Sequence, residues 1–375
     1  MVELRRKLHR IPELAFEEVR TARVLMAELD RLEIPYRYTG PGGGILARVD
    51  GGPGPVVALR AEMDALPGTE TTGLPFASEV PGVVHACGHD AHMAMVIGAA
   101  SLLRERPPPG GVVLVFQPAE ERGGGARVMI RDGALDGVEA IFGGHVTQHY
   151  ETGKVMVASG VITSQSDRFR IDIRGKAGHG ARPHEAIDAV VVAAFLVNAL
   201  QTLVSRDTDP VHPTVVTVGR VEAGSAANVI AGEALLEGTL RTTDPDTRAR
   251  VHDGIARICR AVGELHNAVV EISLGEGYPA VVNTAREAAT ASRAVTRRLG
   301  PDALVAMDHP SLGSEDFSYY LQEVPGCYVR FGVRRPGSEY VPLHSPLFDV
   351  DEDSLSVGAA FFDAVARQAI EELRR

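Results

Sequence analysis

The sequence predicts an α/β fold in which a smaller α+β domain interrupts a larger domain built on a mixed sheet. At both ends of the chain, short apolar runs alternate with longer patterns of helical period, which is typical of helices layered on a sheet. From about residue 165, apolar and polar residues alternate within the strands, and the elements follow the order β-α-β-β-α-β of a ferredoxin-like domain. We therefore expect a discontinuous larger domain, 1–164 and 279–375, and an inserted domain at 165–278.

The larger domain is expected to begin with helices and then to alternate strands and helices. Val19, Ala22, Met26 and Leu29 lie on one stripe of an early helix. Apolar runs without alternation predict fully buried strands, and Gly/Pro-rich stretches predict the turns beside them. The expected strands are 45–49, 56–60, 112–116, 140–144 and 327–333, and the expected later helices are 94–105, 284–299 and a closing helix that reaches Arg375.

The inserted domain shows the alternation that one buried sheet face requires. Phe169, Ile171 and Ile173 share one face of its first expected strand. The expected strands are 169–175, 214–221, 234–241 and 268–274, and the helices between them are about 186–204 and 245–265.

Composition excludes several classes of partner. The chain has 375 residues, 45% of them hydrophobic, and a formal net charge of −11, which disfavours nucleic acid and anionic membranes as partners. Residues 1–20 are too charged for a signal peptide or a membrane span, so we expect a cytoplasmic protein. Three cysteines, Cys87, Cys259 and Cys327, are too few for a disulfide framework and are expected to be reduced.

Polar residues gather where the expected buried strands end. Glu62 and Asp64 follow the strand 56–60, Glu120 and Glu121 follow 112–116, and His145 follows 140–144. Ligands of open α/β sheets bind beyond the carboxyl ends of the strands. These residues are therefore predicted to meet in one crevice.

The run HACGHDAHM at 85–93 indicates a metal site, because so many ligand-type side chains are costly to bury without a cation. Cys87 and His89 form an i, i+2 pair that can face one ion from a loop, and Gly88 permits close backbone approach. Because Glu120 and Glu121 are adjacent, one carboxylate can bind metal while the other accepts and donates protons. We assign no role to the histidines elsewhere, which are His9, His149, His212, His252, His266 and His309.

Several motifs resemble the aminoacylase/carboxypeptidase family of dinuclear-metal amidohydrolases. These motifs are RAEMDALPGTE (60–70), HACGHDAHM (85–93), QPAEE (117–121), GHGARPHEAIDAV (178–190), NVI (228–230), GTLRT (238–242), GSEDFSYY (313–320) and LHSPLFD (343–349). Their order is that of the branch containing hippurate hydrolases, N-acyl-amino-acid amidohydrolases and plant auxin-conjugate hydrolases. The resemblance covers nearly the whole chain and implies a catalytic domain of the zinc-peptidase type with an inserted lid or dimerisation domain.

The resemblance also implies roles for individual residues. The implied ligands of two divalent ions per subunit are Cys87, His89, Glu121, His145 and His344. Glu120 matches the general acid/base, and Asp64 matches an aspartate that orients a ligand.

Four residues outside this set match substrate-binding positions. His179 matches a histidine that polarises the substrate carbonyl, often in the active site of the partner subunit. Asn228 and Arg241 match positions that grip the free carboxylate of the substrate, and Gly313 lies on a loop that lines the pocket in relatives. Together these positions imply a homodimer formed through the inserted domain and domain closure during catalysis.

The chain departs from the pattern of this branch at three places. Glu62 stands where aspartate is common, and Gly144 stands where a larger residue is common. VTQHY, at 146–150, replaces a run that usually contains proline. None of these departures removes a ligand, although the last is expected to alter the pocket wall.

The sequence thus predicts an amidohydrolase that cleaves N-acyl amino acids, with no nucleic acid or membrane partner. A metallo-dipeptidase or carboxypeptidase using the same site is the alternative within the family. A non-catalytic metal-binding protein is disfavoured by Glu120, and a structural zinc protein would unfold on chelation. The Cys/His/Glu donor set leaves Mn²⁺, Zn²⁺, Co²⁺ and Ni²⁺ open.

Overall fold

The computed structural model describes residues 1–375 and divides into two compact units. Unit 1 comprises Met1–Ile162, Val281–His309 and Asp316–Arg375, and unit 2 comprises Thr163–Ala280 and Pro310–Glu315. The expected boundaries lie close to these, but Pro310–Glu315 was expected in the larger domain. This segment packs with unit 2 because Arg241 Nη1 donates to the carbonyl of Leu312 at 2.8 Å, and Ser164 Oγ donates to the same carbonyl at 2.9 Å.

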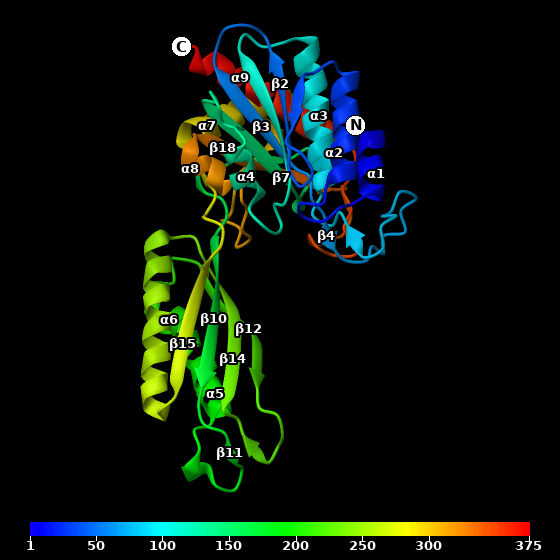
Figure 1. Cartoon of the computed structure of the whole chain (residues 1–375). Helices are drawn as coiled ribbons and strands as arrows, with labels where there is room; N and C mark the ends of the chain where they lie inside the picture. Colours follow the sequence, from blue (N-terminus) through cyan, green and yellow to red (C-terminus); the bar gives the residue numbers. More distant parts are fainter. The chain divides into compact units, whose positions relative to one another are not determined.

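Unit 1 is built on an eight-stranded mixed sheet with the strand order β1-β2-β6-β3-β7-β18-β8-β17. Figure 1 labels β2, β3, β7 and β18 of this sheet. Its four central strands, β6, β3, β7 and β18, run parallel to one another. The strands are β1 (Tyr36–Tyr38), β2 (Ile45–Asp50), β3 (Val56–Glu62), β6 (Gly111–Gln117), β7 (Ala140–Glu151), β8 (Val155–Met156), β17 (Leu304–Val305) and β18 (Gly326–Arg334).

The helices of unit 1 bury one large hydrophobic core against this sheet. Five of the helices each contribute side chains to that core. Examples, one from each helix, are Leu8, Leu25, Met95, Val295 and Phe362. The helices are α1 (Val2–Arg10), α2 (Val19–Arg31), α3 (His89–Glu105), α4 (Gly125–Arg131), α7 (Ala285–Leu299), α8 (Ser318–Glu323) and α9 (Ser354–Leu373). Shorter elements are β4 (Leu66–Pro67), β5 (Val83–Val84), β9 (Gly160–Val161), β16 (Val282–Asn283) and a 3₁₀ turn, Pro301–Ala303.

Two elements of unit 1 differ from the sequence prediction. Helix α3 begins at His89 rather than at residue 94, because Gly88 adopts a left-handed conformation (φ 84°) as its N-cap. A Cβ atom on Gly88 would lie 2.4 Å from Val146 Cγ2, so only glycine fits there. Strand β7 does not end at residue 144, because its pairing with β18 continues beyond that point. His145 therefore lies within a strand, and His89 lies on a helix rather than in a loop.

Unit 2 has the ferredoxin-like topology that the alternation predicted. Its antiparallel sheet has the order β12-β14-β10-β15, and both helices pack on the face that carries Phe169, Ile171 and Ile173. The elements are β10 (Gln165–Arg174), β11 (Gly178–His179), α5 (Ala189–Thr202), β12 (Thr214–Ala223), β13 (Val229–Ile230), β14 (Glu233–Thr242), α6 (Pro245–His266) and β15 (Val269–Glu276), with a 3₁₀ turn at Pro183–Glu185 and a π-helical turn at Leu203–Asp207.

The segment Ala189–Asp207 is long and apolar enough to cross a membrane by length and composition. Leu196 and Leu200 nevertheless lie in the core of unit 2, so one side of this helix packs against the sheet. Its other side is exposed and apolar, with Val190, Val191 and Phe195 each at least 40% exposed.

Candidate metal centre

The five predicted ligands lie close together in unit 1, with His145 inside β7 and Glu121 shortly after β6. Cys87 Sγ lies 3.2 Å from His145 Nε2, and Glu121 Oε1 lies 3.3 Å from His344 Nε2. The donor atoms fall into two groups, Cys87–His89–His145 and Cys87–Glu121–His344, and within each group they lie within 4.8 Å of one another. Because Cys87 belongs to both groups, the arrangement is suited to two neighbouring cations.

Hydrogen bonds orient two of the histidines toward the cluster. His89 Nδ1 lies 2.9 Å from the backbone oxygen of Asp64, and His145 Nδ1 lies 2.7 Å from the carbonyl oxygen of Val146. Since a carbonyl oxygen only accepts, each Nδ1 donates. Each Nε2 is left to face the cluster, which is the usual orientation of histidines that bind metal.

Asp64 connects two of the ligands. Its carboxylate lies 3.3 Å from His89 Nδ1 and also accepts the backbone N–H of Glu121 at 2.9 Å. The side chain is completely buried. Asp64 therefore contacts the ring of one predicted ligand and the backbone of another.

The donor set fits a pair of divalent cations. His89 Nε2 and Glu121 Oε1 are buried without a hydrogen-bond partner, and a cation would satisfy both. Burial raises the pKa of the Cys87 thiol well above its ordinary value, and the Glu121 and Glu120 carboxylates raise it further. Burial opposes protonation of His89, but Asp64 and Glu62 outweigh it and raise the His89 pKa to about 10. Metal binding must therefore displace protons from the cluster.

Glu120 lies beside the ligands on a strained turn. It is 6% exposed, and its carboxylate belongs to a further close group with His89 and Glu121. The preceding residue, Ala119, has a left-handed backbone (φ 54°), which is uncommon for a residue other than glycine. The buried carboxylate of Glu18 accepts the Ala119 N–H at 2.8 Å and holds this turn.

The sequence predicted no role for His92 and only a place in the crevice for Glu62. His92 Nδ1 donates to Glu62 Oε2 at 2.8 Å, and His92 Nε2 accepts the Val146 N–H at 2.9 Å. Both ring nitrogens are thus used, so His92 supports the strand that carries His145 and does not offer a ligand atom. The one sequence signal for the role of His92 was its i, i+3 spacing from His89, which places both side chains on the same face of a helix.

The third histidine of the motif lies apart from the cluster. His85 packs beside His9, with ring centroids 6.3 Å apart, and burial lowers its pKa to about 3. Its ring therefore stays neutral.

Unit 2 separates the four predicted substrate-binding residues into two pairs. His179 and Asn228 lie together, because β11 pairs with β13 and Gly180 N donates to the Asn228 carbonyl. Arg241 and Gly313 lie together at the other end of the sheet, where Arg241 donates to Leu312. Strand β14 (Glu233–Thr242) runs between these ends, a distance of roughly 25 Å at about 3.3 Å per residue. One copy of unit 2 therefore cannot place Asn228 and Arg241 on the same small carboxylate, although the resemblance implied that both positions grip the carboxylate of the substrate.

Packing explains one of the departures from the family pattern. A Cβ atom on Gly144 would lie 2.6 Å from Phe331 Cε2 and 2.7 Å from Val329 Cγ2, so the neighbouring strand fills this space. In the VTQHY run, Gln148 Nε2 donates to the backbone oxygen of Asp349 at 2.6 Å. That contact supports the loop carrying His344.

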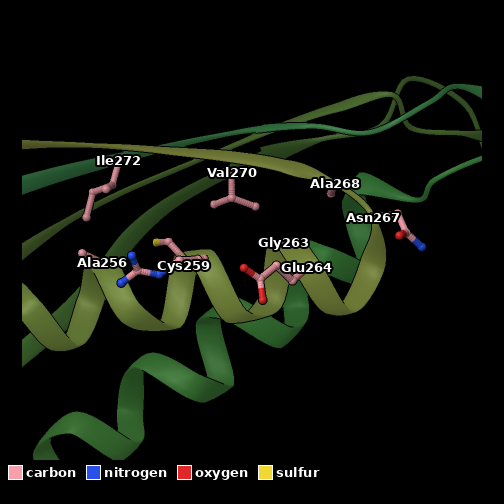
Figure 2. A pocket seen from close by; sticks show the side chains of 9 residues that line it. Ala256, Cys259, Gly263, Glu264, Asn267, Ala268, Val270 and Ile272 are labelled. Carbon is pink, nitrogen blue, oxygen red and sulfur yellow. The ribbon is translucent and has the colours of Figure 1, made fainter.

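A groove of about 520 Å³ in unit 2 lies outside this cluster, between α6 and β15 (Figure 2). Much of its lining is small or apolar, and Cys259 is one of the lining residues. The small and apolar lining residues are Ala256, Gly263, Ala268, Val270 and Ile272. Cys259 and Glu264 are the metal-binding residue types in its lining, which has no histidine.

Comparison with known proteins agrees with this geometry. The family described as peptidase family M20/M25/M40 matches residues 58–368. Thermostable carboxypeptidase 1 of Saccharolobus solfataricus is 38% identical over 96% of this chain and 92% of its own length. N-acetylcysteine deacetylase of Bacillus subtilis is 38% identical, covering 100% and 98%, and IAA-amino acid hydrolase ILR1-like 2 of Arabidopsis thaliana is 40% identical, covering 99% and 85%.

A solved structure extends the similarity to three dimensions. The YXEP protein of Bacillus subtilis, described as a dinuclear metal binding peptidase from the M20 family, superposes with a TM-score of 0.87 at 36% identity. The superposition covers 99% of this chain and 97% of that one. The chain therefore belongs to peptidase family M20/M25/M40.

Proposed function

We propose that this protein is a metal-dependent amidohydrolase that cleaves N-acyl amino acids to a carboxylic acid and a free amino acid. One observation carries the proposal: a second buried carboxylate, Glu120, lies beside the ligand Glu121. Binding a cation does not require that extra group, whereas hydrolysis requires a base. Relatives named N-acetylcysteine deacetylase and IAA-amino acid hydrolase support this substrate class.

Each group of the metal centre has a separate role in the proposed hydrolysis. A pair of divalent cations, when bound, supplies Lewis-acid activation of water and of the amide carbonyl. Glu120 accepts a proton from the attacking water and returns it to the amine nitrogen as the C–N bond breaks. Asp64 keeps His89 and Glu121 in place. We assign Mn²⁺, Zn²⁺, Co²⁺ or Ni²⁺ to the site, because a Cys/His/Glu donor set accepts all four.

The separated pairs of unit 2 favour an active site completed by two chains. His179 and Asn228 of one subunit would contact the substrate carbonyl and carboxylate in the partner's site. Arg241 and Gly313 would serve the site of their own chain, where the Arg241 guanidinium would pair with the substrate carboxylate. We therefore propose a homodimer in which each substrate is held by residues from both copies of unit 2.

The exposed face of α5 supports this dimer. Val190, Val191 and Phe195 form an apolar stripe beside β12, which is an edge strand of the sheet. Exposed apolar stripes and unpaired strand edges are both characteristic of interfaces. We propose that two copies associate through the outward face of α5 and the edge of β12.

A dipeptidase or carboxypeptidase activity is the second candidate, and the thermostable carboxypeptidases favour it. The same metal site would serve both reactions, and the group beyond the scissile bond would distinguish them. We propose a cytoplasmic location, which is supported by three free and buried cysteines.

Hydrolysis of a substrate panel tests the function. Hippurate, N-acetyl amino acids and dipeptides would be assayed with Mn²⁺, Zn²⁺ or Co²⁺ added to the metal-free protein. Glu120→Gln is expected to keep both metal ions and to lose about 100-fold to 10,000-fold in kcat. Absence of turnover with every metal and substrate, or a Glu120→Gln variant as active as the parent, would contradict the proposal.

A further inference from the structure

The first helix contributes a buried ion network next to the metal cluster. Arg5 and His9, one turn apart on α1, both point into the protein and are 1% exposed. Arg5 Nε donates to Asp90 Oδ2 at 2.8 Å, and His9 Nδ1 lies 2.8 Å from the same oxygen. Arg5 Nη2 also donates to Asp349 at 2.6 Å, and Arg5 Nη1 contacts Glu352 at 3.3 Å.

The carboxylates around Arg5 belong to the two segments that carry distant ligands. Asp90 directly follows His89 in the first turn of α3. Asp349 and Glu352 follow His344 in the loop that leads into α9. One guanidinium therefore connects the start of the helix bearing His89 with the loop bearing His344.

The His344 loop is anchored by Phe348 in the core and by several hydrogen bonds. His344 itself has a left-handed backbone (φ 66°), and its side chain is 54% exposed. Its backbone N–H donates to the Ala86 carbonyl at 2.8 Å, and Gln148 donates to the Asp349 carbonyl. Arg5 supplies the charged contacts to this loop from within the protein, because it is the buried member of each pair.

We propose that Arg5 is a positioning residue that sets the distance between His344 and Cys87, and thereby the affinity of the second metal ion. This inference rests on the proposed dinuclear site. The second ion would be held by Cys87, Glu121 and His344, whereas the first group, Cys87–His89–His145, contains no residue of the loop. Arg5 also pairs with Asp90, which follows His89, but His89 keeps its own hydrogen bond to the Asp64 backbone oxygen. Loss of Arg5 is therefore expected to weaken the second ion and to leave the first.

The guanidinium group is essential to this role. Arg5 reaches Asp90 and Asp349 at once through different nitrogens of its planar fork. Lysine carries the same charge on one nitrogen and cannot span both carboxylates in this geometry. A residue needed only for its charge would tolerate lysine, but a residue that fixes a distance would not.

The proposal is tested by titrating the metal-free protein with Co²⁺ alone. Binding is measured by visible absorption and by the metal content of the protein after gel filtration. The parent is expected to bind two Co²⁺ per chain. Arg5→Met and Arg5→Lys are expected to bind the first ion like the parent and the second at least about 10-fold more weakly. Arg6→Met is the matched control, since Arg6 is 43% exposed and contacts only Glu352 of this network, and it is expected to bind both ions normally.

The possible outcomes separate this inference from the proposed function. If the parent binds fewer than two Co²⁺, the dinuclear site itself is wrong. If the parent binds two and Arg5→Met also binds two with parental affinity, or loses both ions equally, the role of Arg5 is overturned. Should Arg5→Met fail to fold, Asp349→Asn decides, because it keeps the Arg5–Asp90 pair and is expected to weaken the second ion alone.

Discussion

At the scale of single residues, the site depends on backbone conformations that most side chains avoid. Ala119 and His344 are both left-handed, and each stands at a turn that presents proposed catalytic or ligand groups. Strained residues persist when their surroundings fix them. Here Glu18 holds Ala119 through its N–H, and the Ala86 carbonyl holds His344 through its N–H.

Glu18 provides a prediction at this scale. It is 2% exposed, one of its oxygens has no partner, and burial together with Asp64 raises its pKa from 4.5 to about 7. The folded protein therefore binds this proton more strongly than the unfolded chain does. The resulting stability is complete below about pH 4.5 and is lost as pH rises through about 7.

Glu18→Gln keeps the oxygen that accepts the Ala119 N–H but cannot ionise. We expect the free energy of unfolding of the metal-free variant to exceed that of the parent at pH 8 by on the order of 3 kcal/mol, and to match it near pH 4.5. Urea denaturation at both pH values measures this. The exposed neighbour is the control, as Glu17→Gln should show no such pH dependence. An equal difference at both pH values would contradict the assigned pKa.

At the scale of elements, α5 carries two opposite faces. Leu196 faces the core of unit 2, whereas Phe195 is 50% exposed. If the outward face forms the dimer, Phe195→Glu places a charge in an apolar interface, and we expect a monomer in sedimentation velocity and a loss of most activity. Val269→Glu is the control, because Val269 is 53% exposed on β15, at the sheet edge opposite β12. A dimeric Phe195→Glu variant would exclude this face.

Helices and strands were predictable from the sequence where the repeat of apolar residues reflected which of their faces are buried. The strands of unit 2 alternate because one face packs on α5 and α6. Strand β6 is apolar from Val112 to Phe116 because it is largely buried on both faces. The length of β7 was not predictable, because it follows from pairing with β18, which is distant in sequence. Likewise, the start of α3 depends on Gly88 fitting against Val146.

Some residues of the candidate site were predictable from the sequence, and others were not. The proposed ligand residues follow from motif chemistry and from the resemblance, since a cluster of Cys, His and Glu at buried strand ends is typical of metal sites. The supporting residues Glu18, Arg5 and His92 were not, because their partners lie far away along the chain. The separation of Asn228 from Arg241 was also hidden, because only sheet register places them at opposite ends of unit 2.

At the scale of the whole molecule, each unit has its own hydrophobic core, and neither core contains a metal ligand. Chelation should therefore leave the fold intact, unlike the behaviour of a structural zinc protein. We expect unchanged far-ultraviolet circular dichroism after treatment with EDTA, a lower Tm because bound metal stabilises the folded state, and recovery of activity when metal is restored. Unfolding on chelation would assign the metal a structural role instead.

The two-chain active site makes a stricter prediction about the dimer. Glu120→Gln damages unit 1 and His179→Ala damages unit 2, so each variant alone is expected to be nearly inactive. In a mixed dimer whose sites combine Glu120 of one chain with His179 of the other, one site contains both defects and the other contains neither. After unfolding and refolding an equal mixture, half the dimers are mixed, and activity should return to about a quarter of the parental value. If His179 served its own chain, every site in the mixture would carry one defect and no activity would return.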